Sequence, residues 1–361
     1  MRAWPILFAA LAACGGGSGT SNTPCSPGGD GTYVVKPYDS LSQYCLLGIS
    51  DSKISLKTGV TPYDLNTPLF SDYATKARAV WLPAGTTATY DAANAFSFPT
   101  GALLIKSFGF KDDVRDEAGK VSWIETRLLI KTDGGWQGYT YVWNDARTEA
   151  TLDFGGKVLS RSIVDDTGAT QSLSYLVPSF NQCKQCHADK DGTVALLGVK
   201  ARNLNRDFAY AGGTENQLHA WARLGLLAGA PDAAAAPKLP TWNDPTTGSV
   251  SERARAYLEV NCAHCHSETG AARTTGLYLA ASQTNPIAFG VCKSPVAAGE
   301  ASGGLLYDVV PGNPDASILN HRLLATSPSV AMPQIGRSVV DAKGTGLVRA
   351  WISGLAGSCH N

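Results

Sequence analysis

The chain has 361 residues, with 30 Lys and Arg against 30 Asp and Glu, so its formal net charge is zero. A neutral chain of this size lacks the strongly basic character that nucleic acids attract, and it is long enough for two or three domains. Its 38 Gly and 19 Pro indicate many turns around β structure or irregular loops.

The first fourteen residues, MRAWPILFAALAAC, combine one positive charge, a short apolar run and small residues before Cys14. This pattern is typical of an export signal, and residues 11–14 (LAAC) resemble the lipobox at which bacterial lipoproteins are cut and acylated. Residues 15–32 predict a flexible tether. We therefore expect a protein lipid-anchored at Cys14 in the bacterial cell envelope, on the periplasmic side or the cell surface. An ordinary secreted protein is the alternative.

Residues 33–175 predict an antiparallel β domain of sandwich type. Runs such as ALLIKSFGF (102–110) and SWIETRLLIKT (122–132) are rich in β-branched and aromatic residues and are separated by Gly, Asp and Asn turns. In residues 140–145 (TYVWND), Tyr141 and Trp143 are expected on one face of a strand and Val142 on the other. This part contains no His and only one Cys, Cys45, so we expect a scaffold or a partner-binding surface here.

Two motifs of the form Cys-x-x-Cys-His follow the β domain, in residues 180–192 (FNQCKQCHADKDG) and 261–270 (NCAHCHSETG). Cysteines three positions apart form thioethers with the two vinyl groups of haem, and the adjacent histidine reaches the iron. A zinc site would leave the histidine after each cysteine pair unexplained, and a thioredoxin-like site would need a βαβ context. Both motifs therefore predict haem c, two groups per chain. The predicted attachment and iron-ligand residues are Cys183, Cys186 and His187, and Cys262, Cys265 and His266.

Helical periodicity begins near the first motif. Residues 214–227 predict a helix with a capping box formed by Thr214 and Gln217, residues 251–266 predict a helix that carries the second motif, and residues 346–355 predict a closing amphipathic helix. The Pro-, Ala- and Gly-rich residues 229–248 predict a linker. We thus expect a multidomain α+β fold. The β domain would precede two mostly α-helical cytochrome c-like units, residues 176–228 and the class I-like unit 249–361.

Each motif supplies one axial ligand of the iron, so the second must come from elsewhere. The sequence has two methionines, Met1 and Met332, and Met1 leaves with the signal. Met332, just before the closing helix, is therefore the expected second ligand of the second haem. For the first haem the candidates stay open and include a Lys, a Tyr, no ligand at all, or one of the histidines His219, His321 and His360.

Four cysteines remain outside the motifs and the lipobox: Cys25, Cys45, Cys292 and Cys359. An even number in an oxidising compartment predicts two disulfides, for which three pairings exist. Proximity in the sequence favours Cys25 with Cys45, and this leaves Cys292 for Cys359.

Taken together, these segments resemble an uncharacterised family of bacterial dihaem c-type cytochromes. Besides both motifs, the resemblance rests on residues 66–85 (NTPLFSDYATKARAVWLPAG), 202–208 (RNLNRDF), 310–319 (VPGNPDASIL) and 331–337 (AMPQIGR), and it covers nearly the whole chain from about Tyr38. The resemblance implies haem binding, electron transfer and an envelope location. It also implies a redox protein, such as a dehydrogenase, as the partner.

We therefore expect an exported dihaem c-type cytochrome that carries electrons between a periplasmic or cell-surface redox partner and an acceptor, without nucleic acid as a partner. The alternative is a dihaem oxidoreductase with an open catalytic site on the first haem, at His187. Electrons would then pass through the second haem, between His266 and Met332.

Overall fold

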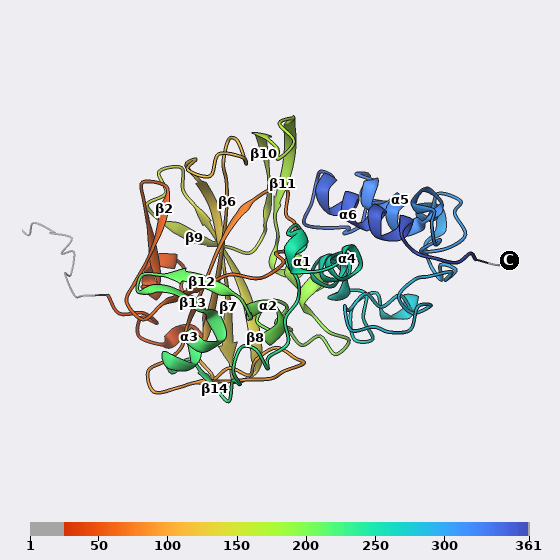
Figure 1. Cartoon of the computed structure of the whole chain (residues 1–361). Coiled ribbons are helices and arrows are strands. Elements are labelled where there is room, and N and C mark those ends of the chain that lie inside the picture. The colour runs from red at the N-terminus through yellow and green to blue at the C-terminus, as the bar shows by residue number, and fades with distance from the viewer. Residues whose placement is uncertain (1–24, 360–361) are drawn as a thin grey trace, which may run out of the picture.

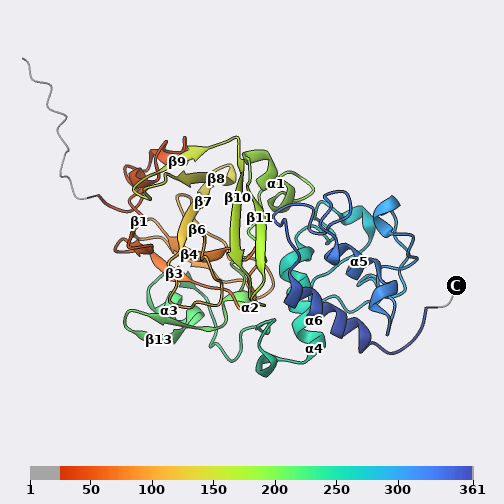
Figure 2. The same ribbon diagram turned by 90° about the horizontal axis from the view of Figure 1, so that it is seen from above.

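The computed structural model describes residues 25–359. These residues build a β-rich half and a smaller C-terminal half of short helices and long loops, which lie side by side in both views (Figure 1, Figure 2). Strands account for 27% of the residues and helices for 21%. The chain is thus mostly β in character.

The largest element of the β-rich half is a six-stranded antiparallel sheet. Its strand order is β3-β4-β6-β7-β8-β9, so each strand from β6 onward pairs with the next one along the chain. The strands are β3 (Thr61–Tyr63), β4 (Thr75–Trp81), β6 (Leu103–Phe110), β7 (Ser122–Thr132), β8 (Gly135–Trp143) and β9 (Ala150–Asp153). Strand β6 and the first half of β7 are buried almost continuously, because both faces of the sheet are covered.

Four two-stranded sheets surround this sheet. Three are antiparallel hairpins, and β14 pairs with β5 in parallel. The strands are β1 (Leu47–Ser50), β2 (Lys53–Leu56), β5 (Ala88–Thr89), β10 (Lys157–Val164), β11 (Thr170–Val177), β12 (Asp207–Tyr210), β13 (Gly213–Asn216) and β14 (Leu227–Ala228). Over residues 25–359 no second large sheet faces the first, so the expected sandwich is not formed.

Each face of the six-stranded sheet has its own core. On one face, Tyr141 and Trp143 pack with Tyr44 and the N-terminal segment. Val142 lies on the opposite face, where it packs with β10 and β11. On the opposite face, apolar residues of β4 and β6 pack with residues 196–236. That second core includes Val80, Leu104, Leu196, Val199, Leu204, Leu218 and Trp221.

The prediction of a mostly helical unit at residues 176–228 is wrong. Its helices, α1 (Phe180–His187), α2 (Ala201–Leu204) and α3 (Gln217–Arg223), are short, and the hairpin β12–β13 lies between the last two. Thr214 lies in β13, and the N-cap of α3 is Asn216, whose side chain accepts a hydrogen bond from the Leu218 amide. The segment does not form a core of its own because its apolar residues complete the core of the sheet.

The prediction of a mostly helical unit at residues 249–361 is wrong as well. The helices α4 (Val250–Leu258), α5 (Ile318–Leu324) and α6 (Ala342–Ser353) are joined largely by loops with short 3-10 turns. Gly and Pro recur through residues 286–314 and prevent longer helices there. The core of this half is formed by α4, α6 and loop residues such as Phe289, whose ring contacts Trp351.

Two disulfides fasten the ends of the described chain. Cys25 pairs with Cys45, and Cys292 pairs with Cys359, which is the pairing that sequence proximity favours. The export signal, the lipobox cysteine Cys14 and His360 lie outside the described residues. None of the helices within 25–359 is long and apolar enough to cross a bilayer.

Candidate functional site

The first motif lies on α1, at the boundary between the two halves (Figure 1). Ser179 begins the helix: its hydroxyl accepts a hydrogen bond from the Gln182 amide, and its own amide donates to the Gln182 side chain. The ring of Phe180 stacks on Tyr139 of β8, with 6.2 Å between ring centres. These contacts fix a short helix on the sheet and direct its cysteines toward the space beside it.

His187, the last residue of α1, is held in one orientation by a backbone carbonyl. Its Nδ1 lies 3.0 Å from the Ala195 carbonyl oxygen. Burial lowers the pKa of His187 to about 4, so the imidazole is neutral at pH 7. Because a carbonyl only accepts, Nδ1 carries the proton and Nε2 keeps a free lone pair, as an iron ligand requires.

A cavity of about 480 Å³ adjoins this motif. Cys183, Cys186 and His187 line it on one side, and the face of the sheet formed by β4, β6, β7 and β8 lines it on another. Residues 194–200 and the loop around Arg337 complete its wall. Its volume falls within the range of cofactor cavities, which is roughly 300–1,000 Å³.

The second motif follows α4, which begins with a capping box between Ser249 and Glu252. A π-helical turn, Glu259–Ala263, continues the helix and places Cys262 in the interior, and such turns often occur at functional sites. Glu259 accepts a hydrogen bond from Arg202 at 2.5 Å, so the β-rich half holds this turn in place.

A second cavity, of about 400 Å³, brings together the residues predicted for the second haem. Cys262, Cys265, His266 and Met332 all line it, although Met332 is 66 residues away from His266 in the sequence. Burial, reinforced by the positive charge of Arg322, lowers the pKa of His266 to about 4. The cavity thus contains a neutral imidazole and a thioether, the donor pair of a His/Met-ligated haem.

The loop that carries Met332 is clamped by Arg337. The Arg337 guanidinium donates to four backbone carbonyls, those of Arg322 (3.1 Å), Ala325 (2.9 Å), Met332 (2.8 Å) and Val339 (3.2 Å). Asp72 from the β-rich half accepts hydrogen bonds from the amides of Ser338 (2.6 Å) and Val339 (3.2 Å) directly after this loop. The position of Met332 is therefore set by both halves of the molecule.

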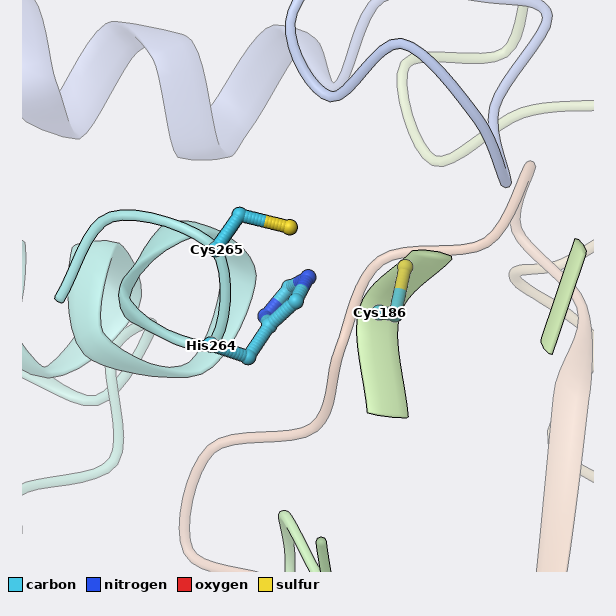
Figure 3. A group of neighbouring side chains, drawn as sticks. All are labelled: Cys186, His264 and Cys265. Carbon is cyan, nitrogen blue, oxygen red and sulfur yellow. The ribbon is translucent and has the colours of Figure 1, made fainter. Parts of the chain in front are cut away.

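The two motifs meet at Cys186, His264 and Cys265 (Figure 3). The sulfur atoms of the two cysteines and a ring nitrogen of His264 lie within 4.8 Å of one another. A hydrogen bond to Cys265, together with burial, raises the pKa of Cys186 to about 12, and the same hydrogen bond lowers the pKa of Cys265. Cys186 and His264 line both cavities, so the cavities adjoin at this point.

Two of the histidines considered for the first haem, His219 and His321, do not line the first cavity, and the third, His360, lies outside the described residues. The His219 side chain is 70% exposed and lies 2.9 Å from Glu215 on the surface. His321 lies on α5, and the described lining of neither cavity includes it. Lys106 and Tyr175 line the first cavity together with His187, so a lysine, a tyrosine or no sixth ligand remain the alternatives there.

Sequence reasoning missed two features of the site. His264, inside the second motif, is not among the predicted ligands, yet a ring nitrogen of it lies within 4.8 Å of the sulfurs of Cys186 and Cys265. The basic side chains of β4, β6 and β7 are not among the predicted site residues, although Arg78, Lys106 and Arg127 line the first cavity. A signal for them was present, because a Lys or Arg interrupts each of these apolar runs at its centre.

No model of a known protein family, no curated protein and no solved structure matches the chain. The residues of the two cavities are therefore the basis for assigning a function.

Proposed function

We propose that the chain is an exported dihaem c-type cytochrome, attached to the bacterial envelope through Cys14, that carries electrons between a periplasmic or cell-surface redox partner and an acceptor. Haem, when bound, supplies a one-electron couple at its iron. The chain supplies the attachment sulfurs, the axial ligands and the walls that keep solvent away.

One observation carries the proposal: each motif opens onto its own cavity of cofactor size. Cys183, Cys186 and His187 line the cavity of about 480 Å³. The second cavity, of about 400 Å³, has Cys262, Cys265, His266 and Met332 in its walls. A zinc-binding or disulfide-exchanging protein does not require two cofactor-sized cavities beside its cysteines.

The contact between the motifs favours an electron carrier. Cys186 of one motif and Cys265 of the other lie within 4.8 Å, so the covalent attachment points of the two groups are neighbours. Two haems attached so close together exchange an electron without any movement of the protein. The different surroundings, with Met332 in one cavity only, would give the two groups different potentials.

A second candidate is a dihaem oxidoreductase with an open site at the first haem. The observation in its favour is the lining of the first cavity, where the described residues include no methionine and no histidine other than His187 and His264. An iron without a strong sixth ligand binds small molecules.

The covalent attachment is tested by the pyridine haemochrome spectrum and the mass of the intact purified protein. We expect two added porphyrins in the parent chain and one in each of the double variants C183A/C186A and C262A/C265A. The matched control C25A/C45A removes two other cysteines and keeps both porphyrins. A parent chain without covalent porphyrin, or one that carries zinc at Cys186, His264 and Cys265, would contradict the proposal.

The two candidate functions are separated by optical spectra of the reduced protein with and without carbon monoxide. Two low-spin haems that leave carbon monoxide unbound identify the carrier. A high-spin component that binds carbon monoxide, and that is absent from C183A/C186A, identifies the oxidoreductase and assigns its open site to the first cavity.

A further inference from the structure

Three cations stand side by side on the sheet where it faces the first cavity. Arg78 of β4 is directly opposite Lys106 of β6, and Lys106 is directly opposite Arg127 of β7. All three line the cavity that contains His187. Adjacent strands are about 4.8 Å apart, and like charges directly opposite one another destabilise a sheet. We call these three residues the cationic row.

The protein neutralises only two members of the row. Arg78 lies 2.5 Å from Asp64, and Arg127 forms a two-pronged ion pair with Glu125 at 2.6 and 2.8 Å. Lys106, between them, forms no ion pair with any residue of 25–359, and its ammonium nitrogen lies 4.8 Å from the centre of the Phe108 ring. Two members of the row thus face a carboxylate, one of which, that of Asp64, also pairs with Arg206 at 3.3 Å, and Lys106 faces none.

Arg78 also has an unused donor. Its side chain is 4% exposed, and its Nη2 has no hydrogen-bond acceptor in the described part of the chain. Buried guanidinium nitrogens are normally paired, so a missing acceptor at a cavity wall indicates a ligand with acceptor oxygens. Burial, with the charges of Arg78, Lys76 and Arg127, lowers the pKa of Lys106 well below its ordinary value, and a nearby anion would oppose this shift.

The row also leads toward the first motif. Thr140 of β8 is opposite Arg127 and lines the same cavity, and α1 with Cys183 packs against β8. The attachment cysteine thus stands at one end of the row, and Lys106 and Arg78 stand toward the other. A group fastened at Cys183 would extend along the cationic row.

We propose that the cationic row binds carboxylate-type oxyanions in the first cavity, with Lys106 as its central contact. Two sources share this chemistry. One is the pair of propionates of the haem attached at Cys183 and Cys186, and this source rests on the proposed function. The other is a free small oxyanion that enters the cavity from solution.

The test is whether Lys106→Met lowers or raises the thermal unfolding midpoint of the purified holoprotein. If the row holds an anion, Lys106→Met removes its main contact and lowers the thermal unfolding midpoint. If the row is empty, the same change removes a like-charge repulsion and a buried charge, so the midpoint rises. Lys157→Met is the matched control, because Lys157 is exposed on β10, and it should leave the midpoint unchanged. A rise in Lys106→Met would overturn the proposal.

Titration of the ferric holoprotein with formate and with nitrite shows whether the bound oxyanion is a free small molecule or a haem propionate. A saturable change in the haem spectrum that Lys106→Met weakens at least tenfold identifies a free oxyanion. With no such change, a shift of the haem propionate bending bands in the resonance Raman spectrum of Lys106→Met, absent from Lys157→Met, identifies the propionates. No response in either measurement would overturn the proposal.

Failure of the proposed function is recognised separately. A parent chain without covalent porphyrin would contradict the haem assignment, and the oxyanion site is then decided by the unfolding midpoint with and without formate. A midpoint that formate raises in the parent but not in Lys106→Met supports the site, and an unchanged midpoint in both contradicts it.

Discussion

His264 is part of the second Cys-x-x-Cys-His motif and lies near Cys186 of the first, but it belongs to neither predicted set of ligands. A ring nitrogen of His264 lies within 4.8 Å of the sulfurs of Cys186 and Cys265 (Figure 3), and its Nδ1 is buried without a hydrogen-bond partner among residues 25–359. Buried polar atoms are rarely left unpaired. An acceptor or a cofactor edge is therefore expected at this junction between the cavities.

Met332 is the residue whose role is most directly testable. Met332→Leu keeps the side-chain volume but removes the thioether from the second cavity, so we expect the reduction potential of that haem to fall. Spectroelectrochemical titration measures the change, and His219→Ala on the surface is the control. An unchanged potential would show that Met332 only fills space.

Lys76 predicts a pH dependence of stability. Burial, followed by the charges of Arg78 and Arg127, lowers its pKa from 10.5 to about 7. Between these values the unfolded chain binds a proton that the folded chain does not, so the free energy of unfolding rises with pH in that window. We expect urea unfolding at several pH values to show a smaller rise in Lys76→Met and the parent slope in Lys157→Met. Equal slopes in all three would contradict the assignment.

At the scale of elements, the segment between β3 and β4 connects the parts of the site. The amide of Phe70 donates to Asn261 at 2.8 Å, just before the second motif. The Thr67 hydroxyl donates to the Pro240 carbonyl at 2.9 Å, and the Asp72 carboxylate accepts from residues that follow the Met332 loop. One stretch of the β-rich half therefore contacts the linker, the second motif and the loop of the expected distal ligand.

This connection predicts the effect of Asp72→Ala. The change leaves the amides of Ser338 and Val339 without their acceptor, which we expect to cost about 1–3 kcal/mol of unfolding free energy. It also frees the loop that holds Met332, so the optical signature of methionine ligation should weaken. Urea unfolding and absorption spectra measure both effects.

Asp145→Ala is the control for Asp72→Ala. Asp145 is fully exposed and lies 3.9 Å from Arg147, so its removal should change the unfolding free energy by at most about 0.5 kcal/mol. If Asp72→Ala loses stability while methionine ligation stays intact, the contact is structural only.

At the scale of the whole molecule, the β-rich half is part of the first site and not a separate scaffold. Strands β4, β6, β7 and β8 form one wall of the first cavity, and apart from Gln185 and Cys186 the second cavity is lined by residues of the C-terminal half. The two halves meet where the motifs meet. Changes in either half are therefore expected to affect both sites.

This arrangement predicts that the two haems titrate as an interacting pair. With neighbouring attachment points, each site is harder to reduce once the other holds an electron, because the added charge is close and poorly screened in the interior. The redox titration of the parent should therefore be broader than the sum of the titrations of C183A/C186A and C262A/C265A. A parent curve equal to that sum would indicate independent sites.

The local features were readable from the residues themselves. The runs at 102–110 and 122–132 form β6 and β7, and the opposite faces of Tyr141 and Val142 follow from the alternation along a strand. The capping box predicted for Thr214 and Gln217 was wrong, since Asn216 caps α3, and the capping box of Ser249 and Glu252 that begins α4 was not predicted. The helical unit predicted at 176–228 was wrong because the apolar residues of 196–236 belong to the core of a distant sheet, and the one predicted at 249–361 was wrong because Gly and Pro recur through residues 286–314.

By itself, the sequence determined which chemical groups are present: two cysteine pairs with their histidines, one methionine after the signal, and strands with their alternating faces. The tertiary structure alone decided which of them are neighbours. Met332 lines the cavity of His266, Cys186 faces Cys265, and Arg78, Lys106 and Arg127 share one wall. Local preferences act over a few residues, whereas these contacts join segments tens of residues apart and follow from packing the two halves together.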